Sequence, residues 1–182
     1  KLNGYDYGDL EVNIFGNNDL SSFDVNAFFS NGRSLGFATR GKINLDSKKG
    51  TLLDLKAYFQ DFALSPFNPF VEGIFYDLRG KMSGLVNIKG SITDPLMDGT
   101  LTLEEAGAGI SYLNLNADIN DGAKIKVNNK TFDIDNWRLT DTAYNTQATL
   151  NGSIRHNRLL DWFLDLKLQT LGKRFIDRKS VV

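Results

Sequence analysis

The chain has 182 residues, of which 41% are hydrophobic and 24% charged, and its formal net charge is −1. These values are typical of a globular domain with a real core, and the near-zero charge argues against binding to nucleic acid or to an anionic membrane surface. Cysteine is absent, which excludes disulfides, thiolate metal sites and cysteine nucleophiles. No apolar run approaches the roughly 18 residues that would span a bilayer.

Apolar and polar residues alternate along most of the chain, beginning with Leu10, Val12 and Ile14. A period of two predicts strands with one apolar and one solvated face, as in antiparallel sheets. The 17 glycines and 3 prolines fit short strands joined by tight turns. We therefore expect an all-β fold, with residues 1–182 forming a single domain. Because the alternation is present from the start, we also expect the chain to be a piece of a longer protein.

One segment, "SPFNPFVEGIFYDLRG", departs from this period. Its apolar residues recur at i, i+3, i+4, i+7, i+8 and i+11, the spacing of one helix face. They are Phe67, Phe70, Val71, Ile74, Phe75 and Leu78. The spacing predicts one short amphipathic helix over about 66–79, packed on the sheet. A membrane-surface helix is the alternative, but Glu72 and Asp77 against Arg79 give its polar face the wrong charge for that role.

Short glycine-containing units recur along the chain. Gly41 and Gly50 are nine residues apart, as are Gly90 and Gly99. The segment Leu-Asp-Leu-Lys begins twelve residues after Gly41 and again twelve residues after Gly152. Repeated strand–turn–strand units predict an extended array in which each unit stacks on the next.

The most regular of these units is "SGLVNIKGSITDPLMDGTLTLEEAG", which contains Gly84, Gly90, Asp94, Pro95 and Gly99. We expect its glycines to end strands and bend the backbone, and its Asp-Pro pair to build a turn. Together with the later segment "WRLTDTAYNTQATLNGSIRHN", it resembles the TamB family, the translocation and assembly module of diderm bacteria, which belongs to the AsmA-like group. The resemblance covers about residues 41–170.

The resemblance implies a fold, a location and a function. The fold is an extended antiparallel sheet curved into a half-pipe (β-taco) with an apolar concave face. Family members are anchored in the inner membrane, cross the periplasm, reach the outer membrane and resemble bridge-like lipid transfer proteins. The implied function is a hydrophobic groove for phospholipid acyl chains. The alternative is a scaffold that pairs strands of outer-membrane proteins, with an outer-membrane barrel-assembly protein as partner. The alternation alone leaves a sandwich, a barrel and an open groove possible.

The candidate lipid-groove residues are the apolar positions of the strands that follow the first glycines of the signature. They are Leu101, Leu103, Leu113, Leu115, Ala117, Ile119, Ile125, Val127, Trp137, Leu139, Leu150, Trp162, Leu164, Leu166 and Leu168. For the two tryptophans, packing and groove wall both stay open. The substitution Leu115→Asp separates the alternatives, because a carboxylate in an open groove stays hydrated, whereas one in a packed core unfolds the domain.

We expect no catalytic residue and no cofactor. His156 is the only histidine, so a metal site would need carboxylates for its other ligands. Ser153, His156 and Asp161 suggest a triad, but in a hairpin Ser153 and His156 would point to opposite faces, and we expect His156 to be a turn residue.

Two further glycine-containing stretches are interpreted as turns or bends. Asp118, Asn120, Asp121 and Gly122 faintly resemble a calcium loop, but the glycine comes one place early and the last ligand position is Asn instead of Glu. We therefore predict a hairpin turn there and no metal. The segment 107–109, Gly-Ala-Gly, is expected to bend the chain between strands.

Overall fold

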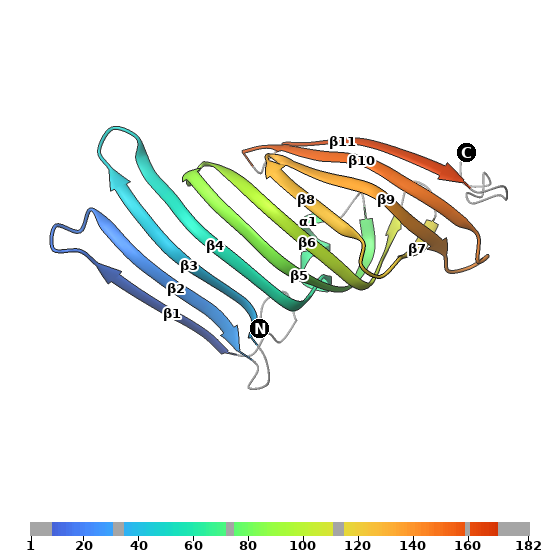
Figure 1. Ribbon diagram of the computed structural model, residues 1–182, viewed down its shortest axis with the longest axis horizontal. Helices are drawn as coiled ribbons and strands as arrows, with labels where there is room; N and C mark the ends of the chain where they lie inside the picture. The colour runs from blue at the N-terminus through green and yellow to red at the C-terminus, as the bar shows by residue number, and fades with distance from the viewer. Residues whose placement is uncertain (1–8, 31–34, 72–74, 111–114, 159–160, 171–182) are drawn as a thin grey trace.

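The computed structural model describes residues 9–30, 35–71, 75–110, 115–158 and 161–170, and these form one antiparallel sheet of 11 strands (Figure 1). The strands are β1 (Asp9–Gly16), β2 (Ser22–Ser30), β3 (Leu35–Asp46), β4 (Gly50–Ala63), β5 (Phe75–Ser91), β6 (Asp94–Ile110), β7 (Leu115–Ile119), β8 (Lys124–Asn129), β9 (Thr131–Asp141), β10 (Gln147–Asn157) and β11 (Asp161–Thr170). The all-β prediction is confirmed. No helix among the described residues is long and apolar enough to cross a membrane.

Strands that follow one another in sequence mostly lie side by side, so the sheet is a ribbon with β1 at one edge and β11 at the other. The exception is the row between β6 and β9, which β7 and β8 share end to end. The sheet twists and curves along its length, and β10 and β11 run at a marked angle to β1 and β2 (Figure 1).

A line of β-bulges crosses the sheet, and we call it the crease. It runs from Asp61 on β4 through Gly80 on β5 and Glu105 on β6, past the break between β7 and β8, to Asn136 on β9. The three non-glycine residues have left-handed φ angles of 50°, 49° and 53°, respectively. Each bulge inserts a residue into the ladder and bends its strand. The crease therefore accounts for the curvature of the sheet between β4 and β10.

Side-chain oxygens replace missing ladder partners along the crease. The amide of Asp61 donates to Ser83 Oγ at 3.0 Å, that of Glu105 to Asp121 Oδ1 at 2.7 Å, and that of Asn136 to Asn151 Oδ1 at 2.7 Å. In each case the acceptor lies on the next row of the sheet. The polar residues between the apolar positions thus keep the bulged amides satisfied.

The helix prediction is wrong for most of its length. Helical structure is limited to the 3₁₀ turn η1 (Ser65–Phe67) and the single turn α1 (Asn68–Val71), whereas Phe75 already begins strand β5. The bulge at Asp77 explains the error, because the extra residue places Phe75 and Leu78 on one face although they are three positions apart. In a bulged strand, apolar residues three positions apart can therefore share a face, as they do in a helix. Ile74 lies outside the described residues.

The sequence repeat corresponds to a repeated register. Gly41 pairs with Leu55 in the β3–β4 hairpin, and Gly152 pairs with Leu166 in the β10–β11 hairpin. An added Cβ would lie 2.0 Å from the carbonyl oxygen of the preceding aspartate in both hairpins. The two Leu-Asp-Leu-Lys segments therefore occupy equivalent positions beside a glycine over which the neighbouring backbone passes closely.

Two of the signature glycines have a different role from the one predicted. Gly84 and Gly99 lie inside β5 and β6 instead of ending them, and a Cβ at either position would meet a backbone oxygen of the neighbouring strand at 2.2 and 2.1 Å. Gly90 pairs with Pro95 next to a two-residue loop, so the Asp-Pro pair opens strand β6 directly after the turn. The glycines allow strands to approach one another within the sheet.

Candidate functional site

One face of the sheet is apolar from β1 to β11. Residues directly paired across an antiparallel ladder point to the same side, so the register traces this face from strand to strand. One such row across the first six strands comprises Ile14, Val25, Gly41, Leu55, Ile88 and Met97. The adjacent row on the other side of the sheet begins with Phe15, Asp24, Lys42, Asp54 and Lys89. The candidate functional site is therefore the apolar face.

The central part of this face is a packed core. Leu115 is 1% exposed and Val127 also 1%, and the buried cluster around them extends over β5 to β10. The predicted groove residues that belong to its buried part are Leu101, Leu103, Leu115, Ala117, Val127, Trp137 and Leu139. Ile119, Ile125, Leu150, Leu166 and Leu168 are half-buried against it. Leu113 lies outside the described residues. The buried residues of this set have almost no surface left for a ligand.

The two tryptophans differ in environment. Trp137 is 7% exposed and donates a hydrogen bond from Nε1 to the carbonyl oxygen of Lys124 at 2.8 Å, which makes it a packing residue of the core. Trp162, on the edge strand β11, is 45% exposed, and Leu164 beside it is 41% exposed. The part of the predicted groove that is open to solvent is therefore the β11 edge.

A larger open region lies at the opposite end, on β1 and β3. Leu10, Val12 and Ile14 are 56%, 49% and 58% exposed, and Leu45 is 49% exposed. The register places all four on the same face as the core. These residues could have been found from the sequence, because their alternation is as regular as that after the signature. The predicted groove nevertheless began only at Leu101.

Five phenylalanines form a continuous aromatic cluster on this face, from β2 to the 3₁₀ turn. Phe37 contacts Phe29, Phe59 and Phe62 with ring centroids 6.2, 5.2 and 6.1 Å apart. Phe62 in turn contacts Phe67 at 6.1 Å. The cluster joins the open region of the apolar face to the packed core.

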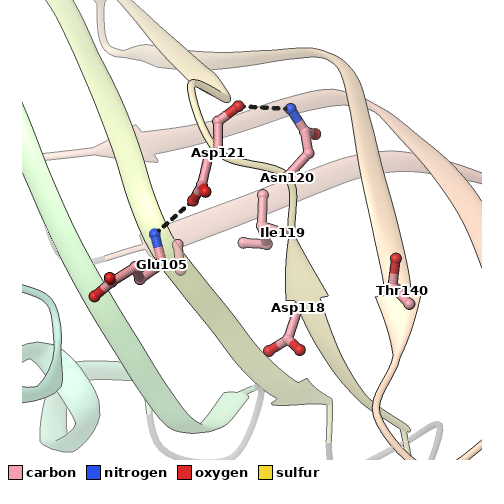
Figure 2. Close-up of a pocket in the computed structure, with 7 residues that line it drawn as sticks. Glu105, Asp118, Ile119, Asn120, Asp121 and Thr140 are labelled. Carbon is pink, nitrogen blue, oxygen red and sulfur yellow. Dashed lines mark hydrogen bonds between the residues drawn. The ribbon is translucent and has the colours of Figure 1, made fainter. Parts of the chain in front are cut away.

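The crease contains a polar pocket of about 400 Å³ (Figure 2). Its lining includes the carboxylates of Glu105, Asp118 and Asp121. Asp121 accepts a hydrogen bond from the backbone amide of Glu105, and Asp118 forms an ion pair with Arg79. Within the described part of the chain, no group of three or more histidines and carboxylates is arranged to hold a metal ion.

The predicted hairpin turn at this pocket is wrong. The segment 120–123 interrupts the row shared by β7 and β8 and keeps hydrogen bonds to both neighbouring strands. Asn120 donates its amide to the carbonyl of Arg138 at 2.9 Å and accepts the amide of Arg138 on Oδ1 at 2.7 Å. The Asn-Asp-Gly sequence is thus part of the crease, where it bends a row of the sheet.

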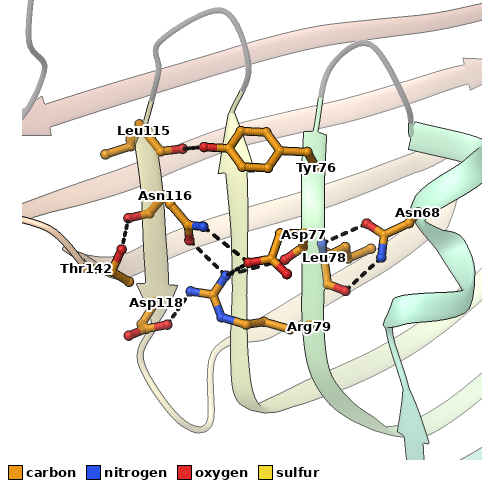
Figure 3. Close-up of polar contacts among 9 residues, drawn as sticks. All are labelled: Asn68, Tyr76, Asp77, Leu78, Arg79, Leu115, Asn116, Asp118 and Thr142. Carbon is orange, nitrogen blue, oxygen red and sulfur yellow. Dashed lines mark hydrogen bonds and ion pairs between the residues drawn. The ribbon is translucent and has the colours of Figure 1, made fainter.

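A polar network on the other face ties β5 to β7 across β6 (Figure 3). Arg79 donates from Nη1 to Asp77 Oδ2 at 3.1 Å and to Asn116 Oδ1 at 2.8 Å, and from Nη2 to Asp118 Oδ1. Arg79 reaches these partners by lying over Gly107, where an added Cβ would be 2.4 Å from Nη2. Tyr76 lies in the same way over Gly109 and contacts the carbonyl of Leu115. The segment 107–109 is therefore inside β6, and the prediction of a bend there is wrong.

Replacing Gly107 by alanine is expected to destabilise the protein by displacing Arg79. The loss should be about 1 kcal/mol, because the ion pairs of Arg79 are partly solvated and such pairs are worth little each. The measurement is a double-mutant cycle by urea denaturation with Gly107→Ala, Arg79→Met and both. In the Arg79→Met background, the Gly107→Ala substitution should have almost no effect. Equal costs in both backgrounds would contradict this account of the glycine.

His156 lies within strand β10 and is 1% exposed, so the prediction of a turn residue is wrong. Its ring lies 5.5 Å from that of Trp162 and 6.0 Å from that of Phe132. Ser153 lies three positions before His156 on the same strand, so its side chain points to the opposite face, as predicted. The structure does not bring a serine, histidine and carboxylate together at this point in the geometry of a triad.

Comparison with protein-family models, curated proteins and solved structures finds no match for this chain. The class that the structure itself defines is an antiparallel β ribbon with one continuous apolar face. The family resemblance depends on the signature residues named above.

Proposed function

We propose that this chain is a periplasmic segment of a TamB-like protein and that its apolar face holds phospholipid acyl chains in transit between the inner and outer membranes. The full-length protein would be anchored in the inner membrane and reach the outer membrane. The observation that carries the proposal is the open region on β1 and β3, where the apolar face continues beyond the core with exposed side chains.

The chemistry of this region suits acyl chains. Leu10, Val12 and Ile14 have pure hydrocarbon side chains. The neighbouring strand β2 adds the half-buried Phe23 and Val25 on the same face. Covering apolar surface gains about 25 cal/mol per Å², or about 0.8 kcal/mol for each buried methylene, without any directional contact. An unbranched hydrocarbon chain can follow such a face across successive strands. Leu10, Val12 and Ile14 offer no side-chain hydrogen-bonding group to a ligand that needs one.

The test uses two neighbouring residues of β1 that point to opposite faces. Ile14→Asp places a carboxylate on the apolar face at a position that is 58% exposed, so the fold should survive while phospholipid uptake falls at least severalfold. Phe15→Asp is the matched control, because Phe15 is 68% exposed on the other face. The measurements are the melting temperature and the crosslinking of a photoactivatable phospholipid.

Equal crosslinking in the folded Ile14→Asp variant and in the wild type would refute this region as the lipid path. Equal loss in both variants would also count against the proposal, since only one of them alters the apolar face.

A scaffold that captures extended polypeptide is the second candidate, and one observation favours it. Among the described residues, β1 pairs only with β2 and β11 only with β10, so each edge offers free backbone groups to a further strand. A native mass spectrum of the purified chain separates the two functions. Bound phospholipid supports the groove, whereas a lipid-free chain that binds an extended outer-membrane-protein peptide supports the scaffold.

A further inference from the structure

His156 occupies a closed aromatic site where strands β9, β10 and β11 meet. Trp162 pairs directly with it on β11, and Phe132 flanks it on β9. The rings of Phe132 and Trp162 are themselves 6.2 Å apart, so the three rings contact one another pairwise. The backbone amide of His156 donates to the carbonyl of Lys130 at 3.0 Å. The imidazole is thus buried at the end of the apolar face, and Trp162 covers it.

Charged groups near this site include residues of three other segments. Lys130, in the turn between β8 and β9, donates to Asp94 Oδ2 on β6 at 2.7 Å. The other carboxylate oxygen of Asp94 is buried and accepts no hydrogen bond from the described residues. Arg158, directly after β10, also acts electrostatically on Asp94. An imidazolium at His156 would therefore be repelled by Lys130 and attracted by Asp94, which Lys130 binds through Oδ2.

The strand that covers His156 is held on one side only. Among the described residues β11 pairs only with β10, and its residues Trp162, Phe163 and Leu164 are 45%, 52% and 41% exposed. An edge strand with few buried contacts is the element that opens at the smallest cost in free energy. Relief of an unfavourable charge at His156 would therefore come from weaker pairing of β11 with β10.

We propose that His156 and Trp162 form an acid-sensitive latch on the edge strand: protonation of the buried imidazole weakens the pairing of β11 with β10 and uncovers the apolar face of β10. The proton comes from solvent, and no covalent bond changes. The latch does not depend on the proposed lipid function, because it follows from the packing of the two rings.

The direction of the pH effect follows from the surroundings of the imidazole. Burial lowers the pKa of His156, the positive charge of Lys130 lowers it further, and Asp94 partly opposes both. The open strand restores the ordinary pKa near 6.5, so the open state binds the proton more strongly. The closed latch is therefore fully stable above about pH 6.5 and loses stability as the pH falls below that value. The hydrogen bond from Lys130 lowers the pKa of Asp94, which stays charged over this range.

The test is hydrogen exchange of the β11 amides at pH 7.5 and pH 5.0, corrected for the intrinsic pH dependence of exchange. In the wild type, protection of residues 162–166 should fall at pH 5.0, by up to about 30-fold, because pH 5.0 lies about 1.5 units below the ordinary imidazole pKa of the open state. The amides of β4 and β5 should keep their protection. Because His156 is the only histidine, this pH range isolates its titration.

His156→Phe and His156→Gln remove the titrating group, and in both variants the protection ratio between the two pH values should return to about one. Either variant can lower protection overall without obscuring the result, since the readout is the ratio within each protein. Lys130→Gln should reduce the ratio and Asp94→Asn should increase it. Retention of the wild-type ratio in both His156 variants would overturn the latch, as would an acid-induced loss of protection that spreads equally over β4 and β5.

Discussion

Replacing Gly84 by alanine is expected to destabilise the protein strongly. The added Cβ would lie 2.2 Å from the carbonyl oxygen of Thr100 and 3.0 Å from the Cα of Leu101. The φ angle of +152° is also one that residues with a side chain rarely adopt. Since backbone atoms of a central strand cannot yield like a side chain, we expect a loss of about 3–5 kcal/mol.

Such a loss should lower the melting temperature by roughly 6–20 °C for a chain of this size. Gly36→Ala is the matched control within the same sheet, because a Cβ there would meet its nearest neighbour, a ring carbon of Phe62, at an ordinary 3.8 Å. Its effect should stay within about 0.5 kcal/mol. Similar melting temperatures for the two variants would show that β5 and β6 can separate locally, against the close approach described above.

The second large effect is expected for Leu115→Asp, which should unfold the domain. Leu115 is 1% exposed within the core cluster, so the carboxylate would be buried without a partner at a cost of about 4 kcal/mol or more. The sequence alone left open whether this residue faces a groove or a core. Because the structure buries Leu115 in the core, we expect the substitution to unfold the domain.

Leu10→Asp makes the same substitution on the same apolar face, at a position that is 56% exposed. Its melting temperature should stay close to that of the wild type. Circular dichroism and urea denaturation of the two variants check both results together. A folded Leu115→Asp variant would mean that the core opens to water, and the groove would then extend over β7.

The individual strands could be predicted from the sequence because they depend on local chemistry. Alternation at Leu10, Val12 and Ile14 identifies a strand with one apolar face, whatever lies next to it. The recurrence of Leu-Asp-Leu-Lys after Gly41 and Gly152 likewise indicated two equivalent hairpins, and their registers match. The apolar face of the candidate site was predictable to the same extent.

The bulges could not be predicted, because they depend on the neighbouring strand. Asp77 adds one residue to β5 and gives Phe75 and Leu78 a helix-like spacing, which only the pairing with β6 identifies as strand. The break at residues 120–123 likewise has the residues of a hairpin turn, but β6 and β9 hold it within a single row of the sheet.

The class of fold and the two-faced character of the sheet are encoded in side-chain periodicity. Which apolar residues are core and which are open depends on how the strands pack together. Leu115 and Ile14 have the same pattern in sequence, yet curvature along the crease buries one and leaves the other 58% exposed. Curvature comes from bulges and from close approaches at glycines such as Gly84, and these are properties of strand pairs that no single strand encodes.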